Sequence, residues 1–314
     1  MNAQTIGQVA ALGTAICWAV TSLSFEAAGR RVGSLSVNLI RLILALVMFA
    51  VYGLAVHGAP FPVGAGRHVW IWLSLSGLVG FVMGDLFLFQ AFVDVGARTA
   101  MLIYSLVPPM TAVIGRLVLD ERLTPAQLLA MGLTVCGVVI VTTKRTSEGG
   151  GAAAATYSEN APRAVETASR PHVVRGIWFA ILGSLGQALG LVLSRYGAPE
   201  YDPFAATQIR TLVGLAGFSV LFFVTHRWGR VAAAFRDVRA MRHIARGALF
   251  GPFLGVSLGL AAAQRAGTGI ASTIIATVPV ILIPVSIFVL KERISIREVV
   301  GACLAVGGVA LFFR

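Results

Sequence analysis

Long apolar runs alternate with short polar connections along this chain, and the alternation predicts its elements. A helix of about 20 apolar residues crosses a bilayer, and ten runs reach that length. The predicted spans lie near residues 7–27, 35–56, 69–93, 99–118, 125–143, 175–194, 203–226, 244–265, 269–289 and 296–313. The pattern therefore predicts an all-α integral membrane protein with ten transmembrane helices.

The second half of the chain repeats the first. The segment VLDERLT at 118–124 recurs as VLKERIS at 289–295, an offset of 171 residues. Further upstream, NLIRLILAL around Arg41 answers TQIRTLVGL around Arg210 at an offset of 169. Because five is an odd number, the second unit enters the membrane from the side opposite to the first. We expect two inverted five-helix repeats, an architecture in which transporters place their site between the repeats.

Composition separates the repeats from a linker. We expect the first repeat at 1–143, a flexible linker rich in Gly, Ala, Ser and Thr at 144–174, and the second repeat at 175–314. A basic stretch, THRWGRVAAAFRDVRAMRHIARG, connects spans seven and eight. It fits either an amphipathic helix on the membrane surface or a solvated basic loop.

The charge and cysteine content narrow the class. The chain is 57% hydrophobic and 12% charged, about half the charged share of soluble domains. Its net charge of +12 comes mainly from arginines in the connections, where they meet anionic headgroups, so the expected partner is the lipid bilayer and not nucleic acid. The three cysteines lie in apolar segments and imply no disulfide framework. The first span lacks a basic leader, so we expect a retained helix.

The arginines and lysines also bear on orientation. They cluster in the connections after spans one, three, five, seven and nine. By the positive-inside rule, both termini should then face away from the cytoplasm.

Polar side chains inside a bilayer are costly, so each is a site candidate. Arg41 lies about 9 Å from its end of span two and Asp85 about 12 Å from the matching end of span three. A buried Arg41–Asp85 pair is therefore allowed, and Glu26 lies on the same side. Such a pair either locks spans two and three together or couples protons or substrate at Asp85; the third alternative is no contact. The candidates inside the spans are Arg41, Asp85, Gln90, Gln187, Arg210 and Gln264.

Arg210 mirrors Arg41, but the mirror of Asp85 is Val256. Three interpretations of Arg210 stay open. It snorkels to the interface, it caps carbonyls of a broken helix, or it meets an anionic group of a substrate, since guanidinium binds carboxylates bidentately.

Prolines and small residues recur at matching places. Prolines inside spans four and nine predict kinks, which membranes tolerate where a cavity resatisfies the backbone, and Tyr104 and Ser105 would line such a cavity. Glycines at four-residue spacing in spans three and eight allow close helix packing or a sliding gate. The hinge and gate candidates are Pro108, Pro109, Pro279, Pro284, Gly80, Gly84, Gly251 and Gly255.

Signatures of enzymes are missing from the sequence. It contains no HExxH, GxSxG or P-loop motif, and its histidines lie in connections or at span ends. We therefore expect no enzymatic activity, no cofactor, no metal site and no ATP-driven step.

Several pieces together resemble the EamA unit of the drug/metabolite transporter superfamily. They are Trp18 followed by small residues, the Leu/Ile–Arg41 step, Gly80 through Gly96, SLVPPMTAVIGRLVLDERLT, Gly132 to Gly137, and in the second copy ATVPVILIPVSIFVLKERIS with Gly307–Gly308. The resemblance implies ten helices in two inverted EamA-type repeats around a central cavity. Spans one, three, four, six, eight and nine would line the cavity, which adds Trp18 to the substrate candidates, and spans five and ten would form the outside or a homodimer face.

The resemblance also implies alternating access, export of small metabolites such as amino acids by bacterial members, and termini in the cytoplasm, contrary to the arginine distribution. Its acid–arginine motif, Glu121–Arg122 and Glu292–Arg293, would form a structural or gating salt link. We expect a secondary transporter in a bacterial inner membrane that exports a small polar metabolite, with protons as coupling ion at Asp85. The alternatives are a facilitative uniporter, a channel, and a non-transporting assembly protein.

Overall fold

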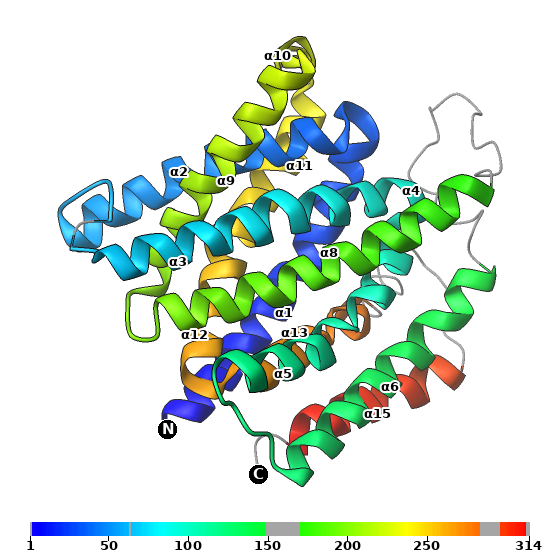
Figure 1. The fold of residues 1–314 in the computed structure, drawn as a ribbon. Coiled ribbons are helices and arrows are strands. Elements are labelled where there is room, and N and C mark those ends of the chain that lie inside the picture. The colour runs from blue at the N-terminus through cyan, green and yellow to red at the C-terminus, as the bar shows by residue number, and fades with distance from the viewer. Residues whose placement is uncertain (1, 63, 149–169, 283–295, 312–314) are drawn as a thin grey trace.

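The computed structural model describes residues 2–62, 64–148, 170–282 and 296–311, which are helical apart from short connections (Figure 1). The first repeat contains α1 (Ala3–Val32), α2 (Ser34–His57), α3 (Arg67–Gly77), the π-helix η1 (Leu78–Gly84), α4 (Asp85–Tyr104), α5 (Val107–Val118) and α6 (Pro125–Glu148). The second contains α8 (Arg170–Gly197), α9 (Pro203–Thr225), α10 (Trp228–Arg236), α11 (Val238–Ala248), the π-helix η2 (Leu249–Gly255), α12 (Val256–Ala266), α13 (Thr268–Ile275) and α15 (Ile296–Leu311).

The described helices match the predicted spans. Six are long and apolar enough to cross a membrane, and four shorter apolar helices occupy the places of spans four, five, nine and ten. The all-helical membrane fold expected from the sequence is therefore confirmed. Helices α6 and α8 extend into both ends of the predicted linker, and the rest of that segment lies outside the described residues.

The two repeats share the same backbone irregularities at an offset of 171 residues. The π-helices η1 and η2 occupy equivalent positions. Gly96 (φ 80°, ψ 155°) and Gly267 (φ 88°, ψ 154°) each end the third span in a conformation that strongly favours glycine. A turn then interrupts the fourth crossing at 105–106 and, equivalently, at 276–277. These shared breaks extend the sequence repeat to the backbone.

The prolines occupy a different place from the one expected. Pro108 and Pro109 lie in the first turn of α5, after the turn, and do not kink a continuous helix. A proline in the first turn lacks only an N–H that would have no helical partner there, so the break itself resolves the conflict. Pro279 follows the equivalent turn, and Pro284 lies outside the described residues.

The first helix of each repeat packs on the third span of the other repeat. Helix α8 contacts η1 and α4, and α1 contacts η2 and α12. A Cβ at Gly186 would lie 2.7 Å from the Cα of Gly84, and one at Gly251 would lie 2.9 Å from the Thr21 methyl. Glycine thus permits both close approaches, as predicted for Gly80, Gly84, Gly251 and Gly255. Any gating role of these glycines stays a prediction.

The last helix of each repeat lies apart from this core. Helices α6 and α15 pack chiefly against each other at one edge of the molecule (Figure 1). A Cβ at Gly137 would meet the backbone N of Ala305 at 2.4 Å, so the two helices are in close contact. Helix α1 begins and α15 ends on the same side of the molecule, which an even number of crossings requires.

The basic stretch between spans seven and eight is helical. It forms α10 and the start of α11, separated at Asp237, whose side chain accepts a hydrogen bond of 2.9 Å from the backbone N–H of Ala240. That N–H and the Arg31 guanidinium, 2.9 Å away, hold the pKa of Asp237 below its usual range. Of the two expected alternatives the helical one is confirmed.

Candidate functional site

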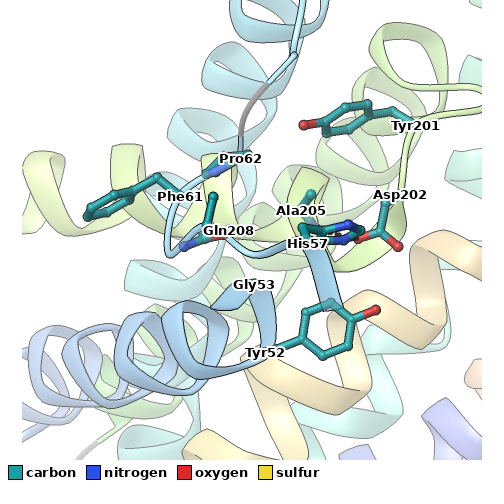
Figure 2. Close-up of a pocket in the computed structure, with 10 residues that line it drawn as sticks. Tyr52, Gly53, His57, Phe61, Pro62, Tyr201, Asp202, Ala205 and Gln208 are labelled. Carbon is teal, nitrogen blue, oxygen red and sulfur yellow. Dashed lines mark hydrogen bonds and ion pairs between the residues drawn. The ribbon is translucent and has the colours of Figure 1, made fainter. Parts of the chain in front are cut away.

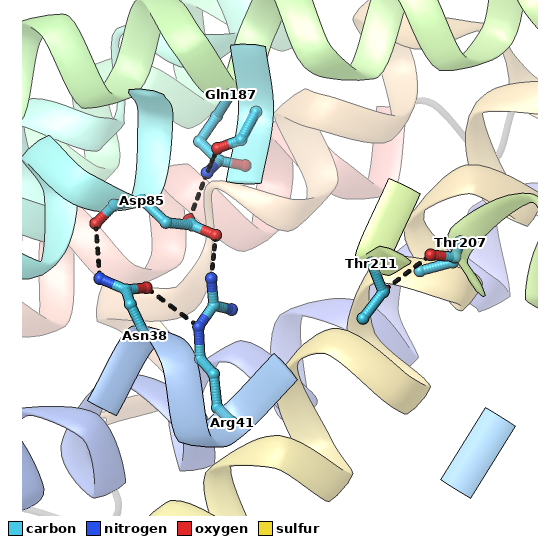
Figure 3. A network of polar contacts seen from close by, with 7 residues as sticks. Asn38, Arg41, Asp85, Gln187, Thr207 and Thr211 are labelled. Carbon is cyan, nitrogen blue, oxygen red and sulfur yellow. Dashed lines mark hydrogen bonds and ion pairs between the residues drawn. The ribbon is translucent and has the colours of Figure 1, made fainter. Parts of the chain in front are cut away.

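A buried polar network joins the two repeats at the level of Asp85 (Figure 3). The guanidinium of Arg41 on α2 forms an ion pair with the carboxylate of Asp85, and the two side chains are 2% and 1% exposed. Gln187 on α8 donates a hydrogen bond of 2.6 Å from Nε2 to Oδ1 of the same carboxylate. The structure thus brings together three of the predicted site residues. Because Gln187 belongs to the second repeat, the carboxylate lies at the interface between the repeats.

Asn38 completes the network. One turn before Arg41 on the same helix face, it accepts a hydrogen bond of 3.0 Å from Arg41 Nε, and it donates one of 3.4 Å to the backbone carbonyl of Asp85. The sequence analysis did not select this residue, although a polar side chain three positions before a buried arginine is a usable signal. Arg41 and Asp85 are therefore a hydrogen-bonded pair of the kind that makes buried charges tolerable.

Aromatic rings surround the Arg41 guanidinium. Its Cζ lies 4.6 Å from the centroid of the Phe89 ring and 5.6 Å from those of Phe25 and Phe81. Cations over ring faces gain stabilisation that increases when water is absent. The rings thus support the charge while excluding solvent.

Arg210 on α9 lies on the other side of the Phe81 ring. Its Cζ is 4.8 Å from the ring centroid, and the side chain is 3% exposed. Its Nε is buried and has no hydrogen-bond partner among the described residues. Arg210 lies within electrostatic range of Asp85, so it points to the interior and does not snorkel.

Trp18 and Tyr104 form a second part of the interior. Their ring centroids are 6.1 Å apart, and both side chains are buried. Tyr104 lies within electrostatic range of Asp85, and the buried Ser105 follows it at the turn that interrupts span four. These candidates therefore adjoin the network, but their role in binding stays a prediction.

Three predicted site residues lie elsewhere. Glu26 pairs with Arg30 one turn further along α1, at 2.9 Å, and does not join the Arg41–Asp85 pair. Gln90 accepts a hydrogen bond of 2.8 Å from the Ser34 hydroxyl. Gln264 donates to the backbone carbonyls of residues 198 and 201, at 2.6 and 2.9 Å. Each has local partners, so depth in the membrane alone misled the prediction.

Glu121 makes a contact between repeats near the termini. Its carboxylate accepts hydrogen bonds from the backbone N–H of Thr268, at 2.9 Å, and from the Thr268 hydroxyl, at 2.6 Å. It therefore caps the N-terminus of α13, where the helix dipole favours a negative charge. This replaces the salt link expected for the motif within the described residues; Glu292 lies outside them.

A pocket of about 290 Å³ lies between the end of α2 and the start of α9 (Figure 2). His57 Nε2 lies 3.7 Å from the Asp202 carboxylate at its wall. Burial and the neighbouring Asp202 carboxylate raise the pKa of Tyr201. His57 is about 24 Å along α2 from Arg41 at 1.5 Å per residue, so this pocket is separate from the network.

Comparisons with known proteins identify the class. In the described residues no three His, Cys, Asp or Glu side chains gather as a metal-ligand set. The EamA-like transporter family model matches residues 5–143 and 174–314, once for each repeat. The chain belongs to this family. As an EamA-family member it is a multi-pass membrane transporter and not an enzyme, as the sequence resemblance implied.

Curated relatives of this EamA-family chain are more distant. Proteins named threonine/homoserine exporter RhtA, from Escherichia coli K12 and O157:H7, are 32% identical over 131 residues. That segment covers 40% of this chain and only 41% of each relative. One solved structure, titled only as a crystal structure of a protein, aligns over 98% of this chain and 96% of its own with a TM-score of 0.66 and 16% identity. It supports the fold alone.

Proposed function

We propose that this transporter exports a small polar metabolite, such as an amino acid, by alternating access. The observation that carries the proposal is the Arg41–Asp85–Gln187 network, buried at the interface of the two repeats. Ionisable groups at membrane depth are costly and mark substrate or ion pathways in transporters. The printed names of the E. coli relatives, exporters of threonine and homoserine, favour an amino-acid-like cargo.

The backbone supports a rocking movement between repeats. Both third spans contain a π-helix and end at a glycine with positive φ, and both fourth crossings are interrupted by a turn. π-Helical turns are frequent at functional sites, and irregular backbone at membrane depth occurs where protein or a cavity resatisfies it. Equivalent irregularities in both repeats give the two halves the same bending points, which alternating access around a fixed site uses.

Proton coupling at Asp85 is the finer part of the proposal. The carboxylate is the single buried acidic group among the described residues, and it can take up a proton, whereas arginine keeps its charge. Protonation would release Arg41 and Gln187 together and so loosen the contact between repeats. Homodimerisation through α6 and α15, whose outer faces expose apolar side chains, and location in a bacterial inner membrane belong to the same proposal.

The first experiment compares medium metabolites from cells producing the intact chain, an Arg41→Ala/Asp85→Asn double variant, and a matched Arg116→Ala/Asp120→Asn variant of an exposed pair. We expect a few compounds to be enriched by the intact chain and by the exposed-pair variant, and not by the double variant. Equal media from all three, with each protein verified in the membrane, would contradict export.

Reconstituted vesicles then separate the alternatives. Saturable flux with counterflow is expected for a carrier, whereas flux that rises linearly with the gradient would identify a channel. A pH gradient should accelerate transport by the intact chain. If an Asp85→Asn variant keeps both the rate and its pH dependence, the coupling hypothesis fails and a uniporter replaces it.

A further inference from the structure

The two membrane-buried arginines occupy equivalent positions but have different surroundings (Figure 3). Arg41 on α2 and Arg210 on α9 are 169 residues apart, and both are almost fully buried. The guanidinium of Arg41 binds Asn38 and Asp85. The side chain of Arg210 makes no hydrogen bond within the described part of the chain, and its Nε is buried unsatisfied. One of two equivalent half-sites is therefore incomplete.

The repeat explains why. Asn38, which accepts the hydrogen bond from Arg41 Nε, corresponds to Thr207, whose hydroxyl instead donates 2.7 Å to the carbonyl of residue 203. The same correspondence relates each polar partner in the Arg41 half-site to a residue of the other repeat that lacks its function. The pairs are Asn38 with Thr207, Asp85 with Val256, and Gln187 with Trp18. The second half-site thus retains the cation and lacks its acceptors.

The charge balance indicates what is missing. Among the described residues, the buried charged side chains are Arg41, Arg210 and Asp85, which sum to one positive charge. An uncompensated charge in a water-poor interior is strongly unfavourable, and arginine cannot relieve it by losing a proton. A second anion would neutralise the interior.

We propose that Arg210 binds a carboxylate of the transported metabolite, so that the ligand takes the place which Asp85 holds beside Arg41. The inference rests on the proposed transport function and names its substrate class, small carboxylates including amino acids. The planar fork of guanidinium matches a carboxylate bidentately. The two guanidinium groups lie over one ring, Phe81, at 4.8 and 5.6 Å, so a ligand bound to Arg210 lies next to the network that joins the repeats.

The test measures thermal stabilisation of the purified full chain in detergent by pools of small compounds. One pool contains the twenty proteinogenic amino acids and simple monocarboxylates, the second their primary amides, and the third the corresponding amino alcohols and alcohols. We expect stabilisation by members of the carboxylate pool only. For the best binder, Arg210→Gln should weaken Kd by about 10–100-fold, the range for a hydrogen-bonded charged group. Arg265→Gln, at an exposed arginine, should leave it unchanged.

Two further variants guard against misfolding. Arg210→Lys keeps the charge but loses the fork, and we expect binding between those of the wild type and Arg210→Gln. Val256→Asp supplies the missing carboxylate from the chain itself, and we expect a folded protein that no longer responds to the carboxylate pool.

Stabilisation by the amides or alcohols as strong as by the carboxylates would overturn the inference, as would no response to any carboxylate. So would carboxylate binding that survives both Arg210→Gln and Val256→Asp. These outcomes are distinct from failure of the proposed function. Export of a compound without a carboxylate would leave transport standing and remove Arg210 from the site, whereas carboxylate binding without any flux would do the reverse.

Discussion

The three buried charges should respond unequally to neutralisation. Asp85→Asn leaves Arg41 and Arg210 buried with no anion, and neither can lose its proton. Removing one partner of a buried pair costs about 3–5 kcal/mol, a factor of at least roughly 100 in the folding equilibrium. Arg41→Met leaves Asp85 with the Gln187 hydrogen bond and within electrostatic range of Arg210. Its carboxyl can also take up a proton, so we expect a clearly smaller loss.

Reversible unfolding in mixed detergent micelles, followed by tryptophan fluorescence, would measure both losses. Asp120→Asn is the matched control, because this aspartate is 77% exposed and pairs with the exposed Arg116. Surface pairs of this kind contribute about 0–1 kcal/mol. A loss for Arg41→Met that equals or exceeds the loss for Asp85→Asn would refute the charge count. A loss for Asp85→Asn no larger than the control would refute the buried pair altogether.

Three other predictions follow from the packing and the charges. Gly186→Ala places a Cβ 2.7 Å from the Cα of Gly84 and should destabilise the fold by about 1–3 kcal/mol, whereas Gly132→Ala, with open space around its Cβ, should not. The same unfolding assay compares the two; equal losses would contradict the close packing. Glu121→Gln weakens the cap on Thr268, so hydrogen exchange in the first turn of α13 should accelerate; unchanged exchange would rule out a capping role. Alkaline phosphatase fused after the last residue should be active and green fluorescent protein dark, if the arginine distribution sets the orientation; the opposite result would favour termini in the cytoplasm.

The sequence predicted the fold better than it predicted the site. Hydrophobic run length and the 171-residue repeat identify the spans, because a bilayer sets helix length directly. The Arg41–Asp85 contact was accessible for the same reason, since depth along two adjacent helices brings them to one level. Their contact with Gln187 was not, because it depends on α8 packing against the third span of the other repeat, and hydropathy carries no information on that choice.

Other misses have local causes. Glu26 has Arg30 one turn away, and this near partner replaces the distant pair. Gln264 lies where unpaired carbonyls of a turn are within reach, and it binds them instead of facing a cavity. In both cases the residue type and depth were suitable, and the competing partner was decided by loop geometry. Pro108 ended up in the first turn of a new helix, because a proline pair terminates a helix more readily than it bends one.

The exchange of first helices between repeats also affects how the chain is made. The glycine face of η2 packs on α1, some 230 residues upstream, so α1 waits about 10–50 s for its partner at ordinary rates of synthesis. The face of η1 likewise stays open until α8 emerges. During that interval the Arg41–Asp85 pair can already form within the first repeat, and its charges enter the lipid neutralised. Arg210 arrives later, into a membrane that already holds Asp85, so the order of synthesis gives the unpaired arginine a counter-charge to insert beside.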